Sequence, residues 1–151
     1  MKFSFRILFV LFSLTIGIVT LAQSTTNVWR PAPGTTWQWQ LSDTVDTSYD
    51  VDMYDIDLFD TPQATIDSLQ ARGVVVICYF SAGSYENWRP DANLFPSNVL
   101  GKKLDGWAGE RWLNIKDIAG LSDVMLGRLD LAVAKGCDGV EPDNVDGYTN
   151  N

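Results

Sequence analysis

The chain has 151 residues, among them 11 basic, 19 acidic and no histidine residues, and a formal net charge of −8 at pH 7. The absence of histidine excludes Ser/His/Asp and Cys/His nucleophile systems and imidazole metal sites within this chain, so we expect no metal and no other cofactor. The negative charge disfavours nucleic acid as a partner and favours cationic ones, and the length suits one modest domain.

Residues 1–22 have the pattern of a secretory signal peptide. Lys2 and Arg6 precede an apolar run at 7–19, and Ala22 offers the small residue of a cleavage site. The alternative is an uncleaved membrane anchor, but the apolar run falls short of the ~20 residues that span a bilayer. We therefore expect a secreted, extracellular protein that is not attached to a membrane. Nine basic and 19 acidic residues then remain, a net charge of −10.

The next segments predict a lead-in followed by strands and a helix. Residues 23–36 are polar and interrupted by prolines, which is typical of an extended lead-in. Residues 37–41 and 51–59 alternate as strands do, and Asp55 lies on the odd-numbered face of the second strand. A helix is expected from Thr61, its cap, to Gly73.

A continuous apolar run at 74–80 predicts a strand covered on both faces, as in parallel sheets. The long loop at 81–91 carries Tyr, Glu, Trp and Arg and is expected to be functional. Residues 111–115 are the next strand candidate. A helix capped by Ser122 is expected to end at Gly136, with an apolar stripe of Met125, Leu129, Ala132 and Val133.

The last predicted strand, at 139–143, ends in a cluster of carboxyl groups. Glu141 and Asp143 are expected to share one face, and Pro142 indicates that the regular strand ends there. The C-terminal ends of parallel strands are where α/β proteins keep their chemistry. The alternative is a solvated acidic loop.

These elements predict an α/β fold with a parallel sheet. No glycine-rich phosphate loop follows the first strand, which disfavours dinucleotide binding and leaves a barrel with acids at its strand ends. Cys78 and Cys137 allow a disulfide in an exported protein, and two buried thiols are the alternative.

Three segments resemble glycoside hydrolase family 114: WQWQL at 37–41, VICYFSAGSYENWRPD at 76–91 and GCDGVEPDNVDG at 136–147. The resemblance runs from Trp37 to the last residue. It implies an endo-α-1,4-polygalactosaminidase with a (β/α)8 TIM-type barrel, which cleaves a cationic, galactosamine-containing polysaccharide.

The resemblance implies catalytic carboxyl groups in the 141–146 segment, for which we choose Asp143 with Glu141 as its partner. Residues two apart on a strand have Cβ atoms about 6–7 Å apart, so the spacing does not exclude Glu141 and Asp143 as the two catalytic carboxyl groups. The predicted substrate-binding residues lie on strand ends, on the loop and among the aromatic side chains: Asp55, Tyr79, Ser81, Glu86, Trp37, Trp88, Asn144 and Asp146. The tryptophans suit core packing and sugar stacking equally.

A complete barrel usually takes about 250 residues. We therefore expect residues 37–151 to be the N-terminal part of a barrel, with about four or five strands. Such an open sheet is expected to associate through its edges and to lack hydrolase activity by itself. The rival function is a carbohydrate-binding module or an inactive fragment, in which aromatic rings stack on sugars without cleavage.

Overall fold

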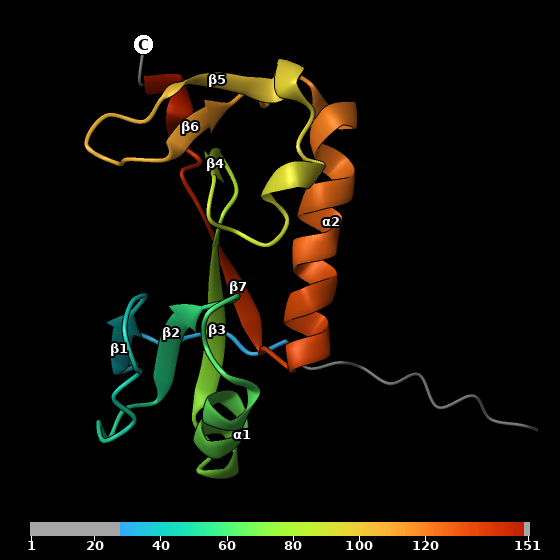
Figure 1. Cartoon of the computed structure of the whole chain (residues 1–151). Coiled ribbons are helices and arrows are strands. Elements are labelled where there is room, and N and C mark those ends of the chain that lie inside the picture. Colours follow the sequence, from blue (N-terminus) through green and yellow to red (C-terminus); the bar gives the residue numbers. More distant parts are fainter. Residues whose placement is uncertain (1–27, 150–151) are drawn as a thin grey trace, which may run out of the picture.

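Two β-sheets and two α-helices make up the part of the chain that this computed structural model describes, residues 28–149 (Figure 1). A parallel sheet has the strand order β1-β2-β3-β7 and an antiparallel sheet the order β4-β6-β5. The parallel strands are β1 (Trp37–Gln40), β2 (Met53–Asp57), β3 (Val75–Ser81) and β7 (Gly139–Asp143). The antiparallel strands are β4 (Ser84–Glu86), β5 (Leu100–Lys103) and β6 (Glu110–Leu113).

The helices are α1 (Gln63–Ala71) and α2 (Ile118–Lys135). Three short 3-10 turns are η1 (Ala92–Leu94), η2 (Ser97–Val99) and η3 (Gly147–Thr149). The expected signal peptide, 1–22, and the start of the expected lead-in lie outside the described residues. Neither helix within residues 28–149 has the length and apolar character needed to cross a membrane.

The core lies between the parallel sheet and its helices. Even-numbered residues of β2 and β3 and the position after β2 face α1 and α2 and are fully or almost fully buried: Tyr54, Ile56, Leu58, Val76, Cys78 and Phe80. They pack against Ile66 and Leu69 of α1 and Ala132 of α2. The odd-numbered apolar residues of β3 are only half-buried, so the run at 74–80 is fully covered on its helix side alone. Burial of the helix side supplies the main hydrophobic stabilisation of the sheet.

Helix α1 begins one residue later than its expected cap. Pro62, rather than Thr61, is the capping residue, and no side chain bonds to the first turn. The backbone N–H of Thr61 instead donates to the carbonyl of Asp57, which continues the turn out of β2. The predicted end holds, because Gly73 has a φ of 80°, a conformation that glycine adopts without strain.

Helix α2 starts a turn earlier than predicted and faces the core differently. Asp117 is its cap, with a side-chain oxygen that accepts a hydrogen bond from the N–H of Gly120 at 3.0 Å. The predicted cap, Ser122, lies inside the helix and donates its hydroxyl to the carbonyl of Ile118.

The predicted apolar stripe of α2 is wrong at two positions. Leu129 and Val133 are exposed, and the buried positions are Leu121, Val124, Arg128 and Ala132. Arg128 is 1% exposed because Asp91 pairs with its guanidinium at 2.8 Å. Hydropathy alone predicts that an arginine lies on the solvent-facing side of a helix. Because Arg128 is buried and paired, it lies on the core-facing side of α2 instead.

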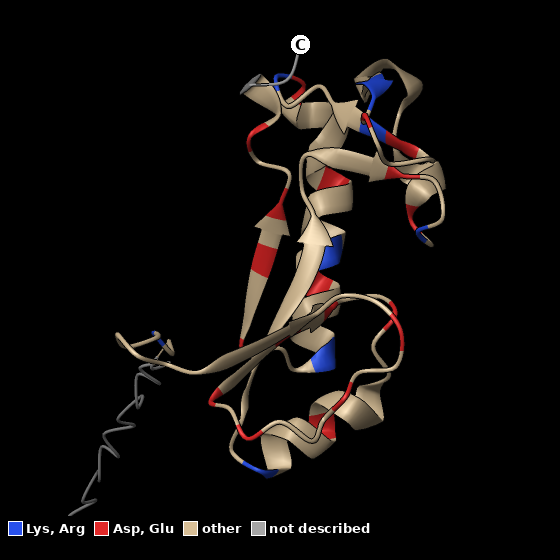
Figure 2. Ribbon diagram, turned by 90° about the vertical axis from the view of Figure 1, so that its left-hand side faces the viewer, with Lys and Arg blue, Asp and Glu red and all other residues tan. Residues whose placement is uncertain are grey.

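The segment between β3 and α2 forms the separate antiparallel sheet. The expected long loop contains β4, and the strand candidate at 111–115 is present as β6. It pairs antiparallel with β4 and β5, so the fourth parallel strand is β7. Figure 1 shows this small sheet beyond the C-terminal ends of β3 and β7. Figure 2 shows the same arrangement from the side, with the two long strands next to each other.

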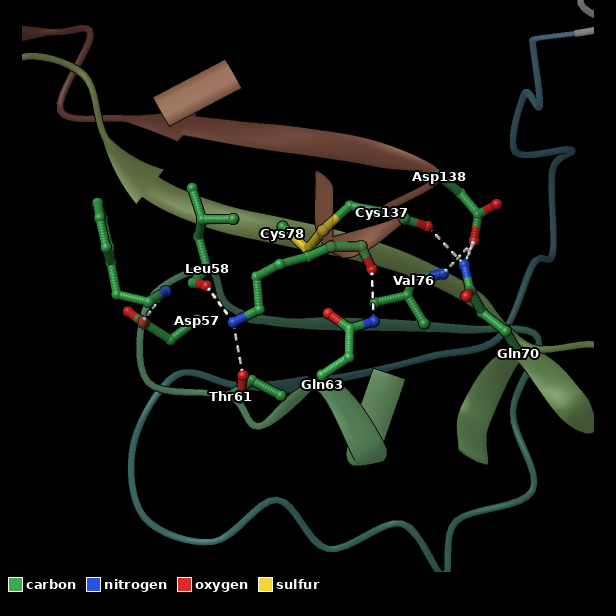
Figure 3. The surroundings of a disulfide bond; sticks show 12 residues. Asp57, Leu58, Thr61, Gln63, Gln70, Val76, Cys78, Cys137 and Asp138 are labelled. Atoms are coloured by element: carbon green, nitrogen blue, oxygen red, sulfur yellow. Dashed lines mark hydrogen bonds between the residues drawn. A yellow bond between two sulfur atoms is a disulfide. The ribbon is translucent and has the colours of Figure 1, made fainter. Parts of the chain in front are cut away.

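A disulfide between Cys78 and Cys137 ties β3 to the segment that follows α2 (Figure 3). The two cysteines therefore form a disulfide and are not two buried thiols. The junction has further bonds, because the Lys135 ammonium donates to the carbonyls of Leu58 and Thr61 at 2.7 and 2.6 Å. The Gln70 amide donates to the carbonyl of Gly136 at 2.7 Å. The end of α2 is therefore held to both β3 and α1.

Reducing this disulfide is expected to lower the free energy of unfolding by about 4 kcal/mol on the chain-entropy model, because the bond closes a long loop in the unfolded chain. Its cysteines are 59 positions apart. Urea unfolding of the same protein with and without reductant measures the difference. Two free thiols by mass spectrometry, or equal midpoints after confirmed reduction, would contradict it.

Candidate functional site

The C-terminal ends of the parallel strands bring most of the predicted acids onto one face of the sheet. Odd-numbered residues of β2, β3 and β7 share this face, which lies opposite the helices. From the strand ends inward, three successive rows contain Ser81 and Asp143, then Asp57, Tyr79 and Glu141, then Asp55 and Ile77. Glu141 and Asp143 therefore share a face, as their spacing predicts.

Asp143 is exposed at the end of β7 and is held by Tyr79. The Tyr79 hydroxyl donates to Oδ2 of Asp143 at 3.1 Å. Burial raises the pKa of the Tyr79 hydroxyl, and the nearby charge of Asp143 raises it further. Tyr79 therefore keeps its proton at physiological pH and orients the Asp143 carboxyl group.

Asp55 and Glu141 form an interacting carboxyl pair across β3. Asp55 is 5% exposed, and burial and the neighbouring charge of Glu141 raise the pKa of Asp55 to about 8. Oδ1 of Asp55 and Oε2 of Glu141 are buried, and no hydrogen-bond partner within the described residues reaches them. Burial and the neighbouring charge of Glu141 thus both favour the neutral form of the Asp55 carboxyl group.

The raised pKa of Asp55 predicts that the protein loses stability as the pH rises from about 4 to about 8. Within this window the folded protein retains a proton that the unfolded chain has released. Each pH unit therefore lowers the free energy of unfolding by up to about 1.4 kcal/mol. Below about pH 4 the folded and unfolded states both hold the Asp55 proton, and above about pH 8 both have lost it. Asp55 therefore makes stability depend on pH only within this window.

Urea unfolding across the window, with wild type beside Asp55→Asn, isolates this contribution. The amide does not titrate, so the variant is expected to have the flatter profile. Asp130→Asn, at an exposed position of α2, serves as the control and should follow wild type. Parallel profiles for wild type and Asp55→Asn would show that Asp55 does not hold the proton.

A chain of hydrogen bonds connects the antiparallel sheet to the strand ends. The Ser84 hydroxyl donates to Oε2 of Glu110 at 2.8 Å, and the hydroxyl oxygens of Ser81 and Ser84 are 2.7 Å apart. The side-chain amide of Asn144 donates to the Ser81 hydroxyl at 2.9 Å. Ser81 and Ser84 are fully buried. The residue next to Asp143 is thus bonded through two serines to β6.

Gly83 allows the chain to pass close to the end of β7. A Cβ atom there would lie 1.9 Å from the backbone oxygen of Asn144, closer than any side chain allows. The N–H groups of Ala82 and Gly83 both donate to the carbonyl of Asp143, at 2.8 and 3.1 Å. The loop after β3 is therefore fixed against the backbone that carries Asp143.

A buried ionic cluster anchors the end of β2 to the loop after β4. Arg89 makes two bonds to Asp57, at 2.6 and 3.0 Å, and one ion pair with Glu86 at 2.9 Å. The guanidinium also lies over the ring of Phe59, 5.0 Å from its centroid. Asp57 and Glu86 are thus charge partners of Arg89 inside the protein.

Three predicted binding residues, Glu86, Trp37 and Trp88, do not gather with the strand-end acids. Glu86 lies in the buried ionic cluster. Trp37 is 57% exposed but starts β1, three rows of residues away from Asp143. Trp88 is half-exposed beside the turn between β5 and β6. Asp146 lies on the exposed turn after β7.

The site also contains residues that the sequence patterns did not single out. Ser84 and Arg89 fall inside the loop predicted to be functional, so composition marked their segment and not their roles. No sequence pattern indicated Glu110 as a site residue, because its bond to Ser84 depends on the pairing of β4 with β6.

Acidic residues dominate the described chain outside the small sheet. Figure 2 shows mostly red positions in the lower part, around β1, β2 and α1, and both red and blue positions on α2 and in the upper part. No group of three or more His, Cys, Asp or Glu side chains within residues 28–149 is placed to hold a metal ion. The strand ends therefore offer carboxyl and hydroxyl groups for chemistry and a negative field for a cationic ligand.

Comparisons with known proteins find one family and several solved structures. The model of glycoside-hydrolase family GH114 matches residues 19–151. The chain is similar to Ega3 of Aspergillus fumigatus, solved in complex with galactosamine, at a TM-score of 0.79 and 58% identity over 84% of this chain and 51% of that one. No sequence among the curated proteins matches the chain.

The glycoside hydrolase domain of PelA from Pseudomonas aeruginosa has a similar fold. The TM-score is 0.60 at 12% identity, and the match covers 76% of this chain and 45% of that one. The chain thus spans about half the length of each of these two structures.

Proposed function

Because this chain belongs to glycoside-hydrolase family GH114, we propose that it is a glycoside hydrolase that cleaves polymers of α-1,4-linked galactosamine. The observation that carries the proposal is Asp143, exposed at the C-terminal end of a parallel strand and oriented by the Tyr79 hydroxyl. This edge is where parallel α/β barrels place their reactive groups. The complex of Ega3 with galactosamine supports an amino sugar as the substrate.

Hydrolysis of a glycosidic bond needs one carboxyl group that protonates the leaving oxygen and another that attacks the sugar or activates water. We assign Asp143 as the carboxyl group that contacts the reacting sugar. Glu141, two residues earlier on the same face, is its partner. Asp55 interacts with Glu141, whose charge raises the pKa of Asp55, and so acts on catalysis through it.

The charge of the protein supports a cationic polymer as substrate. The described residues contain nine basic and 19 acidic residues, a net charge of −10. Galactosamine units carry ammonium groups at neutral pH, so the negative field at the strand ends attracts them. The same field repels the phosphates of nucleic acids.

We further propose that the protein is exported and that residues 1–22 are the signal peptide. The Cys78–Cys137 disulfide supports this, because such bonds persist in oxidising compartments and are rare in the cytosol.

The test is the release of reducing ends from partly deacetylated α-1,4-galactosaminan by the purified protein, with a pull-down on the same polymer. We expect binding by this chain, and release by a protein that carries the whole barrel, because an open sheet is expected to lack hydrolase activity by itself. Binding without release would instead favour a non-catalytic carbohydrate-binding protein, for which the exposed rings of Trp37 and Trp39 are suited. If neither occurs, the substrate class is wrong.

A further inference from the structure

Four side chains from different parts of the chain form a hydrogen-bond relay that ends on the residue after Asp143. Its members are Glu110 of β6, Ser84 of β4, Ser81 at the end of β3, and Asn144. The two serines are fully buried, and Glu110 is 7% exposed. A buried polar network of this kind specifies one arrangement of the chain when every member is satisfied.

The carboxyl group of Glu110 fixes the direction of every hydrogen bond in this relay. A carboxylate only accepts, so the single proton of the Ser84 hydroxyl goes to Oε2 of Glu110, at 2.8 Å. The proton in the 2.7 Å contact between the two serine oxygens must then come from Ser81. Because both serine protons are committed, the Ser81 oxygen accepts from the side chain of Asn144, at 2.9 Å. The amide nitrogen of Asn144, and not its oxygen, therefore faces the serines.

The backbone of Asn144 has a conformation that needs support from its surroundings. Its φ is 59°, in the left-handed region that asparagine and aspartate enter more readily than other residues with a side chain. The preceding carbonyl, that of Asp143, accepts from the N–H groups of Ala82 and Gly83 at 2.8 and 3.1 Å. Sparsely populated backbone conformations persist where such contacts over-determine them, and they cluster at active sites.

Two separate supports thus reach Asp143. Tyr79 bonds its carboxyl group from β3, and the relay fixes the backbone next to it from the antiparallel sheet. The Asp143 side chain is exposed, so its position depends on these supports rather than on close packing. A displacement of about 1 Å is enough to cost a catalytic group much of its effect.

We propose that Glu110 and Asn144 are positioning residues for Asp143, and that the direction of the relay, set by Glu110, holds the end of β7 in place. This inference rests on the proposed function, because it assigns the support of the proposed catalytic group. It gives the amide nitrogen of Asn144 a role inside the protein rather than on the substrate.

The relay predicts that Asn144→Asp disrupts the strand end, although the two side chains have nearly the same size. Both ends of the relay then only accept, so each serine donates outward and no proton remains for the contact between their oxygens. The N–H groups of Ala82 and Gly83 reveal the change, since they bond the Asp143 carbonyl. Their hydrogen exchange, measured by NMR on this chain, is expected to be at least about tenfold faster in the variant.

Adding Glu110→Gln to Asn144→Asp is expected to restore slow exchange, because the double variant reverses the relay. The new amide at position 110 donates to Ser84, whose hydroxyl donates to Ser81. The Ser81 hydroxyl then donates to the new carboxylate at position 144. Every member is again satisfied, so exchange should return to within about threefold of wild type. Glu110→Gln alone keeps an acceptor oxygen and should also stay within that range.

Three controls separate the relay from general effects. Pairing Asn144→Asp with Asp105→Asn removes an exposed acid of the same hairpin outside the relay, so exchange should stay fast. Asn93→Asp, at an exposed position of η1, makes the same substitution elsewhere and should match wild type. The N–H of Leu58, which bonds the carbonyl of Tyr79 at 2.9 Å, should exchange within about twofold of wild type in all variants.

Equal exchange in wild type and Asn144→Asp, or no recovery in the double variant, would overturn the proposal. An equal acceleration at Leu58 would also overturn it, because the relay would then support the whole fold rather than Asp143.

A protein that carries the whole barrel adds the kinetic measurement. There Asn144→Asp is expected to lower kcat about tenfold with KM within about twofold of wild type, and the double variant should recover kcat. A normal kcat in Asn144→Asp would reject the positioning role and leave the proposed function intact. If wild type releases no reducing ends while hydrogen exchange behaves as predicted, the proposed function is rejected and the relay's hold on the strand end stands.

Discussion

In a protein that carries the whole barrel, replacing Asp143 by asparagine is expected to lower the hydrolysis of α-1,4-galactosaminan by about a thousandfold or more and to leave binding of the polymer largely intact. An essential carboxyl group contributes by proton transfer or attack, and general acid–base catalysis alone accounts for roughly 10²–10⁴-fold. The amide of asparagine has nearly the same size as the carboxyl group of aspartate and keeps an oxygen that can accept the hydrogen bond from the Tyr79 hydroxyl. It cannot exchange a proton or attack as a carboxylate does, so the loss should fall on kcat.

The measurement combines reducing-end release with calorimetric binding on the same polymer. Asp123→Asn, at an exposed position of α2, is the matched control and should keep wild-type turnover. Tyr79→Phe removes the hydroxyl that orients Asp143 and should cause a smaller loss, on the order of tenfold. Near-normal turnover in Asp143→Asn would remove Asp143 from the catalytic step and pass that role to another carboxyl group.

The family and the parallel strands were predictable because their signals are local. The motifs at 76–91 and 136–147 predicted family GH114 and its barrel class, and the family match and the likeness to Ega3 confirm both. The strands at 37–41, 51–59 and 74–80 appear with shifts of a few residues at their ends. Alternation and β-branched runs are properties of consecutive residues, so no knowledge of the fold is needed to find them.

The contacts within the site depend on the order of the strands, which no local pattern contains. Asp55 meets Glu141 only because β3 lies between β2 and β7, whereas the sequence suggested that Glu141 and Asp143 form the pair. The buried position of Arg128 depends in the same way on Asp91, which lies 37 positions away. Interactions between charged groups that are distant in the sequence therefore limited how accurately the site and the buried face of α2 could be predicted.

The buried ionic cluster shows most clearly how such distant contacts hold the site. Arg89 comes from the loop after β4, and its partners Asp57 and Glu86 come from β2 and β4. All three are buried. Removing one partner of a buried ion pair is costly, because the remaining charge stays in a poorly solvating interior.

Arg89→Met is therefore expected to lower the free energy of unfolding by roughly 5 kcal/mol, at the upper end of the range for buried pairs, because buried Asp57 loses its cation and Glu86 keeps only the more distant Arg128, at 4.0 Å. Arg89→Lys keeps the charge but not the two-pronged contact with Asp57, so it should fall between wild type and Arg89→Met. Arg111→Met is the control: among residues 28–149 its exposed guanidinium bonds only to the carbonyls of Gly101 and Leu100, and its loss should cost less than about 1 kcal/mol. Urea unfolding of the four proteins decides the point, and equal stabilities for Arg89→Met and Arg111→Met would mean that the cluster contributes no net stability. Acid should restore part of the loss in Arg89→Met, since carboxyl groups left without a cation become neutral when they take up protons.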